Sequence, residues 1–351
     1  MSDTDRSRPR LTRRGFLAST AGLLAAAGAG TPREARAAMR AGDIPAAADA
    51  EPFWGPHQGG IATPTQSHIY FATFDLVLER RDDLIQLMRN WTRAAARLSA
   101  DQPASALGHD AEQPASDSAE ALGLPPERLT LTFGFGASLF EKEGRDRYGL
   151  AAHRPEALID LPRFNGDQLV EAHTGGDLSV QACANDPQVA FHAVRQFARI
   201  ADGIAKLRWV QAGFLPGVVA GQTPRNLMGF HDGTMNPSID DPSVMAQFVW
   251  VGSEGPDWMR GGSYVVARRI RMALEHWDRM KLAFQEQAFG RQKYSGAPLG
   301  MSREQDPLDL AALDKDGNPV IAATAHVRLG APELNGGVQI LRRSYSYNDG
   351  G

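Results

Sequence analysis

The chain has 351 residues and a mass of 38.0 kDa, which is enough for two domains or for one large one. Its single cysteine excludes an intrachain disulfide framework, a cysteine-based zinc site and a Cys-ligated iron–sulfur cluster. The net charge of −4 gives no sign of a nucleic-acid partner, and none is expected.

Residues 1–37 have the pattern of an export signal. Arg13 and Arg14 precede an apolar run at 18–30, and Ala35 and Ala37 are the small residues that a signal peptidase reads. The paired arginines are typical of a twin-arginine signal, and the run is shorter than the roughly 20 residues that span a bilayer. We therefore expect export by the twin-arginine machinery to the periplasm or the extracellular space. The remaining 314 residues carry 30 basic and 38 acidic side chains, a net charge of −8.

A linker at 38–52 and a first domain at 53–220 are expected next. Alternating β-branched and aromatic residues predict strands at 67–78, 129–135, 178–182 and 207–214. Apolar residues at helical spacing predict helices at 81–98 and 188–204. A loop rich in Pro, Ser and Asp covers 101–119.

A second domain is expected at 221–351, with strands at 248–251, 262–270, 320–321, 325–329 and 338–343. A helix is expected at 274–289. Each half thus combines strands with one or two helices in mixed order. This predicts an α+β fold of two domains with antiparallel sheets, divided near 216–224.

The first segment with candidate chemistry is the run from Asn226 to Thr234. Gly229 and Gly233 bracket Asp232, and glycine allows the backbone to approach a flat ligand closely. Asp-Gly is also a common turn pair, and on this segment alone an ordinary turn is the favoured explanation.

Two further segments carry a histidine and a pair of arginines. His326 lies in a strand-like run in which Arg328 would point to the same side. A lone histidine is usually structural, although a neutral imidazole is a common iron ligand. Arg342 and Arg343 would point to opposite faces of a strand. At most one of them should enter an interior, and the other should be solvated.

The order and spacing of these three segments resemble those of the dye-decolorizing (DyP-type) haem peroxidases. Other stretches agree: residues 57–64 read HQGGIATP, and residues 133–140 read FGFGASLF. The stretches 258–264 and 290–299 resemble the exported branch that includes the deferrochelatase/peroxidase proteins. The resemblance runs from about residue 53 to residue 347.

The resemblance implies two ferredoxin-like domains, with one haem b per chain held in the second domain near the domain boundary. It implies that His326 is the proximal iron ligand and that Asp232 and Arg342 are the catalytic residues of the distal side. The neighbouring His231 is the rival of Asp232 for proton transfer. The implied haem-binding residues are Gly233, Thr234, Met235, His326, Ala331, Pro332, Glu333 and Arg342.

Two departures from the family pattern stand out. Ala331, Pro332 and Glu333 replace the usual Asn-Pro-Arg, and an acid at this place would repel the haem propionates. Family members also continue well beyond the Leu-Arg-Arg-x-Tyr segment. The C-terminal part of the second domain is therefore expected to be missing from this sequence.

Three functions follow from the resemblance. The first is a haem b peroxidase that reduces hydrogen peroxide and oxidises an electron donor, with bulky donors such as dyes as the substrate class. The second is a deferrochelatase that releases iron from haem and leaves the porphyrin intact. The third is a non-catalytic haem-binding accessory that works with iron-uptake proteins. A homo-oligomer is expected in each case.

Overall fold

The computed structural model describes residues 49–217 and 222–349, so the expected signal segment and most of the linker lie outside the described residues. Its strands are β1 (His68–Leu76), β2 (Thr130–Phe135), β3 (Leu178–Ala184) and β4 (Ala205–Phe214). Its α-helices are α1 (Arg81–Leu98), α2 (Ala137–Phe140), α3 (Pro187–Ile200), α4 (Pro242–Phe248), α5 (Leu274–Trp277), α6 (Leu282–Phe289) and α7 (His326–Leu329). Short 3-10 helices cover Ala151–His153, Glu171–His173, Asp257–Met259 and Pro332–Leu334. In these described ranges, no helix is both long and apolar enough to cross a membrane.

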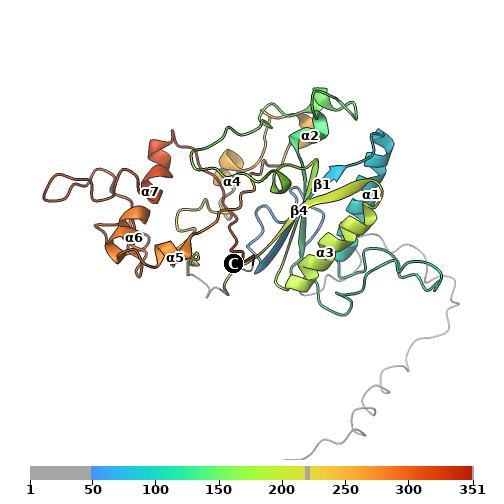
Figure 1. The fold of residues 1–351 in the computed structure, drawn as a ribbon, viewed down its shortest axis with the longest axis horizontal. Helices are drawn as coiled ribbons and strands as arrows, with labels where there is room; N and C mark the ends of the chain where they lie inside the picture. Colours follow the sequence, from blue (N-terminus) through green and yellow to red (C-terminus); the bar gives the residue numbers. More distant parts are fainter. Residues whose placement is uncertain (1–48, 218–221, 350–351) are drawn as a thin grey trace, which may run out of the picture. The chain divides into compact units, whose positions relative to one another are not determined.

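The first half forms a four-stranded antiparallel sheet with the order β2-β3-β1-β4. Ala72 in β1 lies opposite Val180 of β3 on one side and opposite Val210 of β4 on the other. The helices α1 and α3 connect strands that are parallel without being neighbours, and they pack together beside the sheet (Figure 1). This βαββαβ arrangement is ferredoxin-like. The predicted α+β class is confirmed, and each element predicted in this half is present.

Trp91 of α1 is the centre of the core between the helices and the sheet. Its side chain is fully buried, and its ring lies 5.1 Å from that of Phe74, 5.7 Å from that of Phe133 and 5.6 Å from that of Phe197. The indole Nε1 donates a hydrogen bond of 3.0 Å to the carbonyl of Phe197. This bond satisfies the one polar atom that the buried ring carries. At the other end of α3, Asp186 caps the helix by accepting from two backbone N–H groups.

The second half differs from its predicted secondary structure. The described residues 222–349 form no strand ladder, so the strands expected at 248–251, 262–270, 320–321, 325–329 and 338–343 are wrong. Phe248 instead ends α4, and His326 begins α7. The helix expected at 274–289 is interrupted after Trp277, because Lys281 has an extended backbone (ψ 143°) before α6 begins. The apolar residues of this half predicted strands. Segments 265–266 and 338–340 have no neighbouring strand among the described residues with which to form a ladder.

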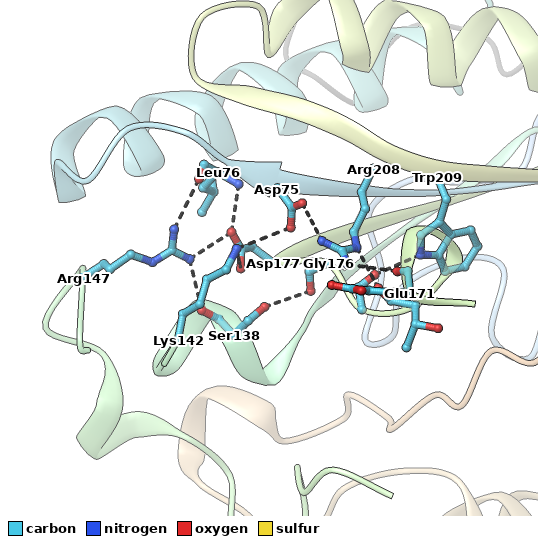
Figure 2. Close-up of polar contacts among 12 residues, drawn as sticks. Asp75, Leu76, Ser138, Lys142, Arg147, Glu171, Gly176, Asp177, Arg208 and Trp209 are labelled. Carbon is cyan, nitrogen blue, oxygen red and sulfur yellow. Dashed lines mark hydrogen bonds and ion pairs between the residues drawn. The ribbon is translucent and has the colours of Figure 1, made fainter. Parts of the chain in front are cut away.

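A buried ion cluster ties the end of the sheet to the irregular stretch between β2 and β3 (Figure 2). Asp177, which is fully buried, accepts a hydrogen bond of 2.8 Å from the backbone N–H of Leu76. Its carboxylate lies 2.9 Å from Nη2 of Arg147 and 3.7 Å from Nζ of Lys142. Arg147 also donates to the carbonyl of Ser138. One carboxylate thus joins β1, β3 and the segment after α2.

The same cluster continues toward β4 through Asp75. Its carboxylate lies 2.9 Å from Nη1 of Arg208, which in turn donates to the carbonyl of Glu171 (Figure 2). The indole of Trp209 donates to the carbonyl of Gly175. These contacts hold the 171–177 segment against the end of β4.

The face of the sheet opposite the two helices is covered by the segment that includes residues 57–66. Thr132 donates to the carbonyl of Gly59 at 2.6 Å, and Gln181 donates to the carbonyl of Gly60 at 2.9 Å. The C-terminal segment lies beside the edge strand β4, because Phe214 of β4 and Ser346 exchange two backbone hydrogen bonds. Segments near both ends of the described chain therefore contact this sheet.

Candidate functional site

The loop that carries Asp232 is fixed by aromatic packing. Phe230 is buried, its ring stacks on that of Phe289 at 4.0 Å, and the Trp277 ring lies against both. Gly229 and Gly233 have φ values of +86° and +111°, in the region where side chains other than hydrogen cause strain. The sequence thus places a rigid aromatic anchor before Asp232 and flexible glycine positions around it.

Asp232 and Arg342 are brought together as the resemblance implied. Oδ1 of Asp232 lies 3.0 Å from Nη2 of Arg342, and both side chains remain partly exposed. Asn236 holds the backbone of the arginine: its Nδ2 donates to the Arg342 carbonyl at 2.9 Å, and its Oδ1 accepts from the Arg342 N–H at 2.8 Å. The loop therefore binds Arg342 through both its side chain and its backbone.

Arg343 points the other way, as expected for adjacent residues of an extended segment. It is not solvated, however: Nη1 donates to the carbonyl of Thr63 at 2.6 Å, and Nη2 donates to the side chain of Gln66. Tyr345 is buried against Cys183 of β3, and burial raises the pKa of both groups. The pair therefore divides as expected, with one arginine held inside and one exposed, but the inward residue is Arg343, and Arg342 is the exposed one beside Asp232. A cavity of about 250 Å³ opens beside this segment, lined by Ile61, Thr63, Thr65, Asn236, Pro237, Ser238, Ile239, Leu341, Arg342 and Arg343.

His326 begins α7, so the strand-like environment predicted for it is wrong. Arg328 does not share its face but donates to the backbone carbonyl of Leu310 at 2.7 Å. Burial within the surrounding protein, together with the positive charge of Arg342, lowers the pKa of His326 against the opposing effect of Asp232. The residue is nevertheless exposed, and no described residue forms a hydrogen bond or ion pair with its ring. A neutral imidazole with an available nitrogen therefore lies within the electrostatic influence of Asp232 and Arg342.

The donor set at this site fits haem. No group of three or more His, Cys, Asp or Glu residues that could hold a bare metal ion exists in the described part of the chain. One imidazole alone is a poor site for such an ion, whereas haem iron brings the ring nitrogens of the porphyrin and needs only an axial ligand from the protein. Exposed apolar side chains suited to a porphyrin lie in the adjoining segments; they include Met235, Leu329 and Ile340.

The other residues that the resemblance assigned to haem binding occupy varied positions. Met235 is exposed, and the hydroxyl of Thr234 donates to Oε1 of Glu304 at 2.8 Å. Ala331 is buried, Pro332 begins a 3-10 helix, and Glu333 is exposed. Their roles stay predictions.

Two residues of the site were not singled out in the sequence. Asn236 lies four residues after Asp232, and its spacing gave no signal because its partner is the distant backbone of Arg342. Glu304 lies in a loop rich in Gly, Pro and Asp, where one more acidic residue has no recognisable pattern. Only the folded geometry shows that each of them supports the segment around Asp232.

Comparison with known proteins agrees with this geometry. The family model for the N-terminal part of Dyp-type peroxidases matches residues 58–215, and the model for the C-terminal part matches residues 223–351. The dye-decolorizing peroxidase of Thermobifida fusca is 36% identical, over 100% of this chain and 84% of its own length. The deferrochelatase of Escherichia coli (strain K12) is 37% identical, over 86% of this chain and 71% of its own length.

Solved structures give the same result. Ferric DtpA from Streptomyces lividans matches with a TM-score of 0.78 and 40% identity, over 86% of this chain and 79% of that one. A DyP-type peroxidase from Streptomyces coelicolor matches with a TM-score of 0.78 and 41% identity, over the same shares. These similarities cover both halves of the molecule and the three segments that form the site. The chain therefore belongs to the Dyp-type peroxidase family of haem-dependent oxidoreductases.

Proposed function

We propose that this peroxidase binds one haem b through His326 and that Asp232 and Arg342 carry out the proton transfer and charge stabilisation for peroxide reduction. The observation that carries the proposal is the 3.0 Å pair of Asp232 and Arg342, whose charges act on a neutral imidazole that forms no hydrogen bond or ion pair with a described residue. When bound, haem supplies the redox chemistry by which peroxide is reduced and a donor is oxidised in one-electron steps. The residues of the chain supply ligation, orientation and electrostatics.

Asp232 is the proton carrier in this proposal. Hydrogen peroxide must lose a proton from one oxygen, and the other oxygen must gain a proton to leave as water. A carboxylate within reach of both oxygens accepts the proton and returns it, which is general acid–base catalysis. Asp232 suits this role because the remaining access to its carboxylate lets a small molecule approach.

Arg342 supplies a fixed positive charge. Cleavage of the O–O bond places negative charge on the departing oxygen, and a guanidinium remains protonated at every relevant pH. The two hydrogen bonds between Asn236 and the backbone of Arg342 keep this charge in place. The guanidinium also orients the Asp232 carboxylate, so the two residues act as a unit.

Replacement of the proposed iron ligand gives the first prediction. We expect His326→Ala to lose the Soret absorption that the wild-type protein gains on reconstitution with haem. His276→Ala is the matched control, because His276 is an exposed histidine in the same half of the chain. Equal Soret bands in the two variants would show that His326 is not the ligand.

The lowered pKa of His326 gives a second prediction. Burial and the charge of Arg342 disfavour the imidazolium, so the neutral ligand persists as the pH falls below the ordinary histidine value of about 6.5. Ligation is lost only when the pH passes the lower pKa of the folded protein. We expect the haem affinity of the apoprotein, measured by quenching of tryptophan fluorescence, to fall on acidification with a midpoint below pH 6.5. A midpoint at or above pH 6.5 would contradict this.

Deferrochelation is the second candidate function. It is favoured by the Escherichia coli relative named deferrochelatase, which is 37% identical over 86% of this chain. Incubation with haem under anaerobic, peroxide-free conditions tests it, because release of iron leaves a fluorescent porphyrin. A Soret band that does not respond to peroxide, with no porphyrin fluorescence, would instead support a haem-binding accessory for iron uptake.

We further propose that the chain is exported by the twin-arginine route, on the basis of the sequence pattern at 1–37. Replacement of Arg13 and Arg14 by lysine should retain the protein in the cytoplasm. Cell fractionation of the two forms measures this. Export of both forms in equal amounts would contradict the assignment.

A further inference from the structure

Glu304 contacts the residues on both sides of Asp232 and Gly233. Its Oε2 lies 2.6 Å from Nδ1 of His231, and its Oε1 accepts the 2.8 Å hydrogen bond from the hydroxyl of Thr234. Both partners of the first contact are largely buried, with 14% and 16% of their side chains exposed. One carboxylate from a distant loop therefore joins the two ends of the His231–Thr234 turn.

The loop that presents Glu304 is itself held firmly. Arg291, which is buried, donates from Nη1 to the carbonyl of Glu304 at 2.8 Å and to that of Gly296 at 2.7 Å. A Cβ at Gly296 would lie 3.1 Å from Cγ of Glu304 and 3.2 Å from the ring of His231, so a side chain there would press on both residues. These contacts fix the carboxylate against the imidazole.

Glu304 is charged in this environment. Burial alone would raise its pKa, but hydrogen bonds from Thr223 and Thr234 and the neighbouring His231 hold the pKa below its ordinary value. A hydrogen bond to an ionised acceptor is stronger than one between neutral groups. The carboxylate therefore forms stronger hydrogen bonds with the turn than an amide in its place would.

The turn needs such a support. Among the described residues, Arg342 is the side chain that contacts the Asp232 carboxylate, and it is itself 45% exposed. Gly233 follows directly with a φ of +111°, and a Cβ there would meet no atom within 4 Å. Arg342 orients the carboxylate from one side only, and the backbone N–H of Asp232 donates to the carbonyl of Pro224. The side-chain contacts that hold the turn itself are those of the positions on either side, His231 and Thr234.

We propose that Glu304 is a positioning residue that holds the His231–Thr234 turn so that the Asp232 carboxylate stays directed toward Arg342 and the bound peroxide. This inference rests on the proposed function, in which Asp232 carries the proton. It assigns His231 to the support of the turn rather than to proton transfer, since its Nδ1 faces Glu304.

The test compares Glu304→Ala and Glu304→Gln with Asp309→Asn in haem-loaded protein. Asp309 is an exposed carboxylate of the same loop whose hydrogen bonds reach only the local N–H groups of Ala311 and Ala312. We expect the second-order rate constant for reaction with peroxide to fall about a hundredfold in Glu304→Ala, since small displacements of a catalytic group have effects of this order. Glu304→Gln, which keeps an acceptor for Thr234, should lose about tenfold, and Asp309→Asn should match the wild type.

Four further readouts separate positioning from general destabilisation. The haem content and the rate of donor oxidation at saturating peroxide should stay at the wild-type level in Glu304→Gln. Combining Glu304→Gln with His231→Gln should lower the peroxide rate no further than one substitution alone, because both act through one contact. In the apoprotein, hydrogen–deuterium exchange at 230–236 should be faster in Glu304→Ala than in Asp309→Asn.

Peroxide rates within twofold of the wild type in Glu304→Ala would overturn the inference, as would additive losses in the double variant or an unchanged exchange rate at 230–236. Failure of the proposed function has a different signature. In that case Asp232→Asn would react with peroxide normally, while the exchange measurement on the apoprotein would still report whether Glu304 holds the turn.

Discussion

Asp232→Asn should lower the second-order rate constant for reaction with hydrogen peroxide by about 10² to 10⁴, the usual contribution of a general acid–base residue. The amide has nearly the shape of the carboxylate and can still accept from Nη2 of Arg342, but it cannot take the proton. We therefore expect the haem content of the variant to equal that of the wild type. Stopped-flow measurement of the Soret change after mixing with peroxide gives the rate.

The matched control is Asp240→Asn, an exposed carboxylate a short distance further along the chain, which should react as the wild type does. The pH profile is a second check. A carboxylate titrates near 3.9 and an imidazole near 6.5 in unperturbed form, so the wild-type rate should persist at mildly acid pH. A rate that rises steadily from about pH 5 to pH 8 would indicate an imidazole such as His231 as the proton carrier.

The largest expected loss of stability comes from Asp177→Asn. Only 8% of the Arg147 side chain is exposed, so this change leaves a buried guanidinium without its counter-ion. Removal of one partner of a buried pair typically costs about 3–5 kcal/mol, a large part of the roughly 5–15 kcal/mol that stabilises a folded domain. Urea unfolding followed by circular dichroism measures the free energy of unfolding.

The control for this variant is Glu79→Gln. Glu79 pairs with Arg145, which lies in the same segment as Arg147, but 57% and 68% of the two side chains are exposed. Solvent screens such a pair, so its loss should change the free energy of unfolding by less than about 1 kcal/mol. If the two variants unfold at the same urea concentration, the buried cluster of Figure 2 does not anchor the end of the sheet.

The first half of the chain could be predicted well because each of its elements carries its own periodic signal. In α1, the buried residues Leu84, Leu87 and Trp91 follow one helical face, and in β1 the apolar residues Ala72, Phe74 and Leu76 alternate in sequence with Thr73 and Asp75. These patterns arise from burial against a sheet and two helices that are all present in the same half. Local pattern and tertiary structure therefore agree.

The second half lacks that agreement. Its apolar residues at 265–266 and 338–340 alternate or cluster as in strands, yet Val266 and Ile340 are 60% and 75% exposed and join no ladder. The site was harder to predict from the sequence for a different reason. Its three chemical groups were found through the resemblance, but no spacing rule could bring Arg342 to Asp232 or reveal Glu304, because these contacts join segments that are far apart in sequence.

The hydrogen bonds of Arg343 to Thr63 and Gln66 link the position of Arg342 to the first half of the chain. Arg342 directly precedes Arg343, which is bound to the opening segment of the first half, so that half helps to set where the charge of Arg342 lies. We therefore expect substitutions around residues 59–66 to shift the guanidinium of Arg342. The surface of the ferredoxin-like sheet is then a place to seek altered peroxide activity while the residues proposed for the reaction are kept.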